Sequence, residues 1–119
     1  MTIDIVGLRD ARGVVRLCLT RNPKDFPDCK GPDAVHATVK ATTTLVRYTF
    51  QSVHPGTYAL GTFHDANANG KLDTMMGMPK EGFAFSRNPP MKPRAPRFNE
   101  ASFQGNGPPL LPLKMKYVL

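Results

Sequence analysis

Several segments of the chain alternate apolar and polar residues with a period of two, and this alternation constrains the fold more than any other feature. Within 34–40, for example, Val35 and Val39 alternate with polar side chains. Such a period, rich in β-branched residues, is typical of half-buried strands. Twelve prolines and ten glycines interrupt the chain and disfavour long helices, so only 23–29 and 98–103 can hold a helical turn. The predicted strands are 2–8, 13–20, 34–40, 44–53, 57–63, 82–85 and 110–119.

About seven short strands separated by turn residues predict an all-β sandwich that forms a single domain over residues 1–119. The first two strands, joined by the tight connection 9–13, are predicted to pair as a hairpin. In the fifth strand, Tyr58, Leu60 and Phe63 are the predicted core residues.

The segment 74–109 is predicted to be mostly irregular, although it makes up about a third of the chain. A compact domain rarely carries so long an irregular segment unless function or anchoring holds it. A cation bound at one end, together with apolar contacts, would order it. The predicted apolar anchors are Phe83, Phe85, Phe98 and Phe103.

The loop that begins at Asp65 resembles a calcium-binding loop in its spacing. Asp65, Asn67 and Asn69 place oxygen-bearing side chains at alternate positions, and Gly70 then allows a sharp turn. Ca2+ takes six to eight oxygen ligands at about 2.3–2.6 Å, and a loop of this kind supplies most of them. The predicted ligands are Asp65, Asn67, Asn69, the carbonyl of Lys71, Asp73 and Glu81.

This loop does not match the helix-loop-helix calcium hand. The twelfth position, which should be a bidentate Glu, is Met76, so Glu81 is the nearest carboxylate that can complete the shell. With so few carboxylates, the predicted dissociation constant is on the order of 10⁻⁴–10⁻³ M. The alternative is an ordinary turn, because Asp and Asn cap their own backbone and tolerate left-handed geometry.

Charge points to a second candidate site. The chain carries a net charge of +7, and the proline-rich segment 87–97 holds four basic residues and no acid. Such a segment attracts anions, including acidic polysaccharides. It contains no aromatic residue of the kind that stacks on bases, which argues against specific nucleic-acid binding. The alternative is a solvated, semi-extended surface loop. The predicted anion-binding residues are Arg87, Lys92, Arg94 and Arg97.

Two cysteines, Cys18 and Cys29, flank a short polar segment. Their even number and close spacing predict a disulfide in an oxidising compartment, with two separate buried thiols as the alternative. The chain opens with Met1 directly before a strand, so it is either cytoplasmic or the mature form of an exported protein. No apolar run approaches the 18 residues of a membrane-spanning helix.

The order of several blocks resembles a known family. These blocks are Gly13 to Leu19, Pro55 to Leu60, His64 to Asp73, Gly77 to Asn88 and Pro96 to Phe103. Together they are similar to the bacterial domain of unknown function 2141. The resemblance implies a secreted protein with a transthyretin-like or carboxypeptidase-regulatory-like β-sandwich, located in the periplasm or outside the cell.

The predicted function is therefore a non-catalytic, exported binding or structural module of the cell envelope, in which a weak Ca2+ loop orders the long surface segment. Its partner would be an envelope protein or polysaccharide. Exposed strand edges allow either a monomer or a dimer formed by strand addition. One alternative is a polyanion-binding protein that acts through 87–97. A further alternative is a hydrolase that uses His64 and Glu81 as an acid–base pair.

Overall fold

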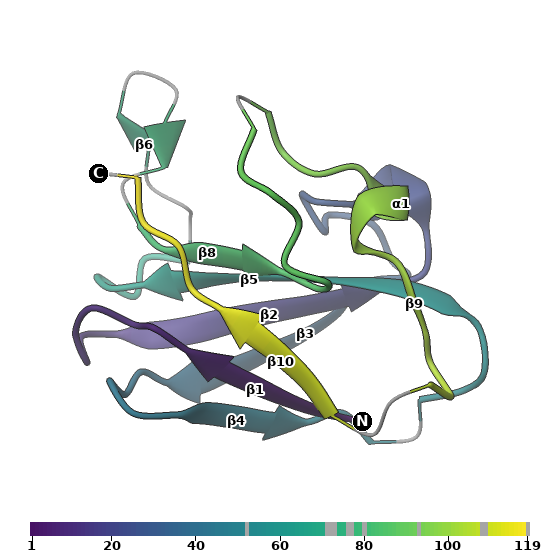
Figure 1. Cartoon of the computed structure of the whole chain (residues 1–119), viewed down its shortest axis with the longest axis horizontal. Coiled ribbons are helices and arrows are strands. Elements are labelled where there is room, and N and C mark those ends of the chain that lie inside the picture. The colour runs from purple at the N-terminus through teal and green to yellow at the C-terminus, as the bar shows by residue number, and fades with distance from the viewer. Residues whose placement is uncertain are drawn as a thin grey trace.

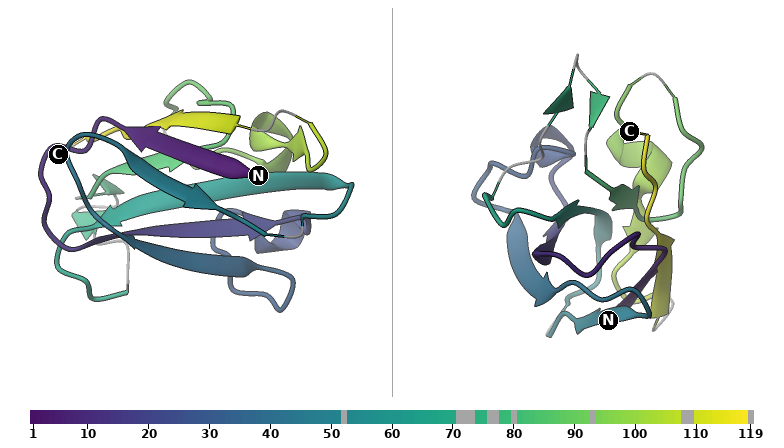
Figure 2. Two further views of the ribbon diagram at one scale, coloured as in Figure 1. Left: turned by 90° about the horizontal axis from the view of Figure 1, so that it is seen from below. Right: turned by 90° about the vertical axis from the view of Figure 1, so that its left-hand side faces the viewer.

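Eight strands form two sheets that pack face to face (Figures 1 and 2). The computed structural model describes residues 1–51, 53–70, 74–75, 78–79, 81–92, 94–107 and 110–118. The smaller sheet has the order β10-β1-β4, and the larger has the order β3-β2-β5-β8, with β9 paired to the start of β5. The bounds are β1 Thr2–Val6, β2 Val14–Thr20, β3 Val35–Lys40, β4 Val46–Thr49, β5 Thr57–Asp65, β8 Phe83–Phe85, β9 Phe103–Gln104 and β10 Leu110–Lys114.

The short elements lie in the connections. A 3-10 turn, η1, spans Pro23–Asp25, and a single helical turn, α1, spans Phe98–Ala101. Strands β6 (Thr74–Met75) and β7 (Met78–Pro79) form a small separate hairpin. Both predicted helical turns and the predicted short strand at β8 are therefore confirmed. No helix among the described residues has the length and apolar character needed to cross a membrane.

The core lies between the inner faces of the two sheets. Strand β1 contributes Ile3 and Ile5, and these side chains face Val15 and Leu17 of β2 within one buried cluster. Strand β1 buries alternate residues, as the period of two predicts, whereas in β2 the alternation stops at Leu17 and the last four residues are all buried. The cluster is completed by residues of the other strands and their flanks, including Leu19, Val46, Phe50, Leu60, Ala84, Leu111, Leu113 and Met115.

The predicted hairpin between the first two strands is wrong. Strand β1 pairs with β10 in parallel and with β4 in antiparallel register, whereas β2 pairs with β3 and β5. The connection between β1 and β2 therefore crosses from one sheet to the other. A period-two pattern identifies the buried face of a strand but does not identify its neighbours, so both arrangements satisfied the same alternation.

The prediction of Phe63 as a core residue is also wrong. Strand β5 continues to Asp65, and its inner face carries Leu60 together with Thr62 and His64, which are almost fully buried. Because side chains alternate across a strand, Phe63 must point to the outer face, where it is only partly buried. Leu60 and Phe63 are three residues apart, so the sequence already indicated that their side chains point to opposite faces of a regular strand.

Aromatic contacts and one disulfide hold the long connections against the outer face of the larger sheet. Phe26 contacts Phe85 and Phe98 edge to face, with ring centroids 5.7 and 6.2 Å apart. The predicted disulfide is present between Cys18 and Cys29, whose Cα atoms lie 6.3 Å apart. The segment after β5 is therefore ordered at least in part by apolar contacts, as predicted.

Candidate functional site: a cationic groove with an aromatic floor

One row of side chains crosses the outer face of the larger sheet. Arg16 of β2 is the cross-strand partner of Phe63 of β5, which in turn pairs with Phe83 of β8. Phe83 is bridged on its other side to Lys116. Cross-strand partners share a face of the sheet and lie close together. The row therefore has a basic side chain at each end, Arg16 and Lys116, and two phenylalanine rings between them.

This row forms the floor of a groove with a volume of about 1070 Å³. One wall is formed by residues 88–92 and 94–96, which lie between the end of β8 and α1 (Figure 1). Phe85 extends the aromatic floor, because its ring centroid lies 6.0 Å from that of Phe83. Among the described residues, six Lys and Arg residues line the groove against two acidic residues, Asp28 and Glu100, so this lining is positive.

Arg16 is held in position by polar partners on both sides. Its Nε donates to Oδ2 of Asp65 over 2.6 Å, and its Nη1 donates to the hydroxyl of Thr38 over 3.3 Å. The Asp65 side chain is fully buried, whereas 32% of the Arg16 side chain is exposed and lines the groove. The sheet therefore presents to the groove a guanidinium whose orientation is fixed by a buried carboxylate.

The Asp65 carboxylate stays ionised because several donors converge on it. Burial by itself raises its pKa, but hydrogen bonds from Arg16 and from the backbone N–H groups of Gly70 and Asn69 outweigh burial and lower the pKa. The backbone donors lie 2.7 Å (Gly70) and 3.1 Å (Asn69) from the carboxylate oxygens. Asp65 thus closes its own loop and neutralises Arg16 at the same time.

These contacts bear directly on the predicted calcium ligands. Both carboxylate oxygens of Asp65 already accept hydrogen bonds, and Asn67 Oδ1 accepts from Asn69 N–H over 3.3 Å. Glu81 does fold back onto the loop, where its Oε2 accepts from Ala66 N–H over 2.9 Å.

The remaining predicted ligands, Lys71 and Asp73, lie outside the described residues. Within the described part of the chain, no group of three or more His, Cys, Asp or Glu side chains is placed to hold a metal. The described residues therefore fit a self-capped turn better than a cation shell. Calcium binding stays a prediction.

The predicted anion-binding residues separate into three places. Lys92 and Arg94 line the groove, and both form ion pairs with Glu100, at 3.3 and 2.7 Å. Hydrogen bonds from Arg94, and then from Arg97 N–H, hold the pKa of Glu100 far below its ordinary value. Arg87 instead points its guanidinium at carbonyls of α1.

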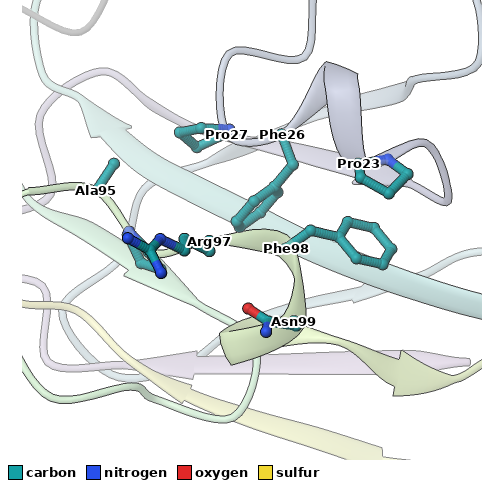
Figure 3. A pocket seen from close by; sticks show the side chains of 8 residues that line it. Pro23, Phe26, Pro27, Ala95, Arg97, Phe98 and Asn99 are labelled. Carbon is teal, nitrogen blue, oxygen red and sulfur yellow. The ribbon is translucent and has the colours of Figure 1, made fainter.

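Arg97 lies at a second, shallower groove of about 540 Å³, between η1 and α1 (Figure 3). Phe26 and Phe98 form much of its surface, together with prolines on either side. Its two aromatic residues, Phe26 and Phe98, are part of the apolar cluster that anchors α1. This groove is therefore explained by the anchoring of the connections.

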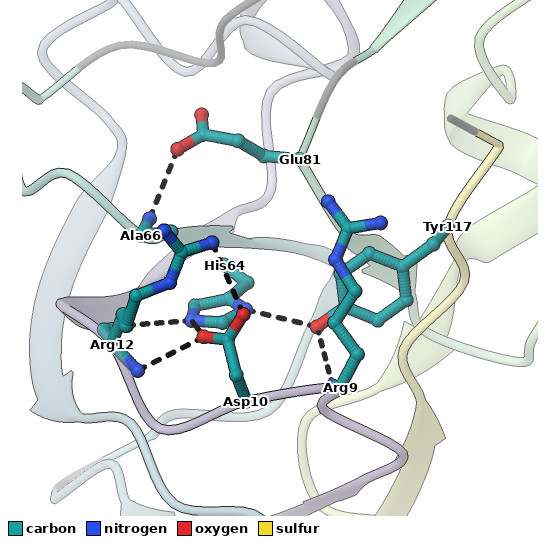
Figure 4. Close-up of polar contacts among 7 residues, drawn as sticks. All are labelled: Arg9, Asp10, Arg12, His64, Ala66, Glu81 and Tyr117. Carbon is teal, nitrogen blue, oxygen red and sulfur yellow. Dashed lines mark hydrogen bonds and ion pairs between the residues drawn. The ribbon is translucent and has the colours of Figure 1, made fainter.

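His64, the predicted acid–base residue, is part of a closed hydrogen-bond network on the inner face (Figure 4). Its ring is 1% exposed. Nε2 lies 2.7 Å from the carbonyl oxygen of Arg12, so Nε2 carries the proton and donates. Nδ1 then accepts from the hydroxyl of Tyr117 over 2.9 Å, and that hydroxyl accepts from Arg9 N–H over 3.1 Å. Both ring nitrogens have structural partners.

The groove itself was not predicted from the sequence. Its floor joins residues 16, 63, 83 and 116, which lie on separate elements. Two signals were present in the sequence. Arg16 is a basic residue in the middle of an apolar strand, and Phe63 is an aromatic residue on the more polar face of its strand. Neither signal identifies a groove until the order of strands in the sheet is known.

Comparison with known proteins identifies one family. The family model described as "Uncharacterized protein conserved in bacteria (DUF2141)" matches residues 3–109, from β1 to beyond β9. Comparisons with curated proteins and with solved structures gave no match. The transthyretin-like subtype therefore stays a prediction, while the all-β sandwich is what the structure shows. On the strength of a match over most of its length, the chain belongs to the bacterial family DUF2141.

Proposed function

We propose that this protein is a non-catalytic module, exported to the bacterial envelope, that binds an anionic ligand in the groove over its larger sheet. The observation that carries the proposal is the row from Arg16 through Phe63 and Phe83 to Lys116, which places a guanidinium at one end of an aromatic floor and an ammonium at the other. A groove with such a lining raises the local concentration of anions and favours their binding.

The basic proline-rich segment supports the same site. It supplies Lys92 and Arg94 to the wall of the groove. The proposed envelope module and the alternative polyanion-binding protein would therefore use the same surface. Because Glu100 pairs with both of these side chains and Asp65 pairs with Arg16, the exposed cations Lys30 and Lys114 carry more of the positive field.

Two observations support the non-catalytic and exported parts of the proposal. The buried His64 has both ring nitrogens in hydrogen bonds with structural partners, which leaves it poorly placed to exchange protons with a substrate. The Cys18–Cys29 disulfide is of a kind that persists in oxidising compartments such as the periplasm.

The test compares two double variants with the same change in net charge. Lys30→Gln/Lys114→Gln removes two exposed cations of the groove, whereas Arg21→Gln/Lys24→Gln removes two exposed cations outside its lining. On a carboxymethyl column, the groove variant should elute at clearly lower salt than the control variant. Equal elution of the two variants would contradict the proposal, because the groove would then not dominate anion binding.

A further inference from the structure

We propose that the groove binds a single-chain anionic amphiphile, with its acyl chain on the phenylalanine floor and its carboxylate head at Arg16. This inference rests on the proposed function and names the ligand class for the same groove. Two features of the groove carry it: the apolar character of the floor and the fixed position of the guanidinium.

The floor is unusually apolar for the outer face of an antiparallel sheet. Such faces are normally polar when they meet water. Here Phe63, Phe83 and Phe85 are all only partly buried, and they form a continuous surface. The wall above them carries Met91, whose side chain is 51% exposed. Contiguous exposed apolar groups of this kind mark a binding surface.

The head-group position follows from how the two terminal cations of the row are used. Lys116 Nζ already donates to the carbonyl of Pro89 over 2.8 Å. Arg16 is oriented by Asp65 and Thr38, which lowers the entropy cost of engaging a ligand. A planar guanidinium also matches a carboxylate better than an ammonium does. The head is therefore assigned to Arg16.

The dimensions of the floor suit an extended chain. Adjacent strands are about 4.8 Å apart, so the floor from Arg16 across Phe63 to Phe83 spans roughly 10 Å. Phe85 lies two residues further along β8 and adds roughly 7 Å in that direction. A fully polar polyanion would satisfy the cations but would leave the three rings in water, whereas an acyl chain would cover them.

The experiment is isothermal titration of the full chain with dodecanoate, below its micellar concentration, at low salt. Saturable one-to-one binding is expected. Acetate, which has the head without the chain, and dodecyltrimethylammonium, which has the chain with the opposite charge, should each bind at least tenfold more weakly.

The variants locate the site. Phe63→Thr changes a partly exposed residue on the outer face, so it should fold normally and weaken dodecanoate binding at least tenfold. Val35→Thr, an equally polar change at an apolar side chain that is 53% exposed and lies outside the groove, is the matched control and should bind as the unchanged protein does. Arg16→Lys keeps the charge but loses the planar fork, and it should weaken binding about fivefold.

Each outcome separates this inference from the proposed function. If dodecanoate does not bind while the groove variant still elutes early from the carboxymethyl column, the ligand class is wrong and the anion-binding groove stands. If binding is equal in Phe63→Thr and Val35→Thr, the ligand lies elsewhere and the inference is overturned. If dodecanoate binds only through its charge, so that acetate competes equally, the acyl-chain assignment is wrong.

Discussion

Arg16 and Asp65 form an ion pair across neighbouring strands, with Nε and Oδ2 2.6 Å apart. The pair has two roles in the structure. It holds the guanidinium at the groove, and it keeps the carboxylate ionised so that it can close the loop that follows β5. The same ion pair therefore contributes to the stability of the fold and to the proposed binding groove.

Asp65→Asn should lower the free energy of unfolding at pH 7 by about 3 kcal/mol. Breaking a buried ion pair costs about 3–5 kcal/mol, and the partial exposure of Arg16 places this pair at the low end. Urea denaturation at pH 7 measures the effect. A loss below about 0.5 kcal/mol would mean that water screens the pair as it does on an ordinary surface.

The same variant should change how stability depends on pH. The pKa of Asp65 is lower in the folded state than its unfolded value of about 3.9, so its contribution is present above that value and is lost as the pH falls through the folded pKa. The difference in melting temperature between the unchanged protein and Asp65→Asn should therefore shrink below about pH 4. A difference that stays constant from pH 7 to pH 3 would contradict this linkage.

Gly13→Ala should prevent normal folding. Gly13 has a φ of +67°, and a Cβ at this position would clash with the backbone oxygen of Asp65, which no adjustment of a side chain can relieve. Gly70→Ala is the matched control, because its φ is +81° and a Cβ there meets nothing within 4 Å. That variant should lose only about 1 kcal/mol from left-handed geometry. Circular dichroism and thermal melting of both variants check the contrast.

Tyr117→Phe should destabilise the protein by about 1–2 kcal/mol, because it removes the hydroxyl that donates to Nδ1 of the buried His64 and accepts from the N–H of Arg9. Tyr48→Phe is the control, since the Tyr48 hydroxyl forms no hydrogen bond with another described residue. Equal denaturation midpoints for the two variants would show that the His64 network contributes nothing to stability.

Reduction of the Cys18–Cys29 disulfide should cost about 2–3 kcal/mol, as the cross-link closes a loop between residues 11 apart in sequence. The measurement is the urea midpoint with and without a phosphine reductant. Cys18→Ser/Cys29→Ser should show the lower midpoint under both conditions. If reductant also lowers the midpoint of that double variant, the effect does not come from the disulfide.

The calcium prediction is decided by thermal unfolding of chelator-treated protein. Ca2+ binding with a dissociation constant near 10⁻⁴ M would stabilise the fold by about 2.7 kcal/mol at one hundred times that concentration. The rise should saturate, should exceed that produced by Mg2+ and should vanish in Asp65→Asn. Absence of any shift at 10 mM Ca2+ would leave the loop as the self-capped turn that its hydrogen bonds form.

The strands were predictable because each alternation is local. In β1 and β10 the buried residues alternate with more exposed ones, as the sequence pattern indicates. The pairing of strands was not predictable. A hairpin between β1 and β2 would bury the same faces of these strands as the observed crossover between the two sheets does. The order of strands depends on packing across the core, which no short window contains.

The candidate site divides in the same way. The loop from Asp65 to Gly70 was recognised from its local spacing, but the partner that changes its meaning, Arg16, comes from 49 residues earlier in the chain. The groove needed the full register, since Phe63 and Phe83 become neighbours only through the pairing of β5 with β8. The sequence therefore identified the oxygen-bearing side chains of the loop, but it did not show that Arg16 already forms an ion pair with Asp65.

The pairing of β1 with β10 has a consequence for the order in which this protein is made and folded. Thr2 of β1 and its register partner Leu110 of β10 lie 108 residues apart in the chain, so Thr2 is synthesised long before its partner. Contacts between such distant positions form slowly, because a long loop must close first. The smaller sheet therefore stays incomplete until β10 has been synthesised and has reached β1.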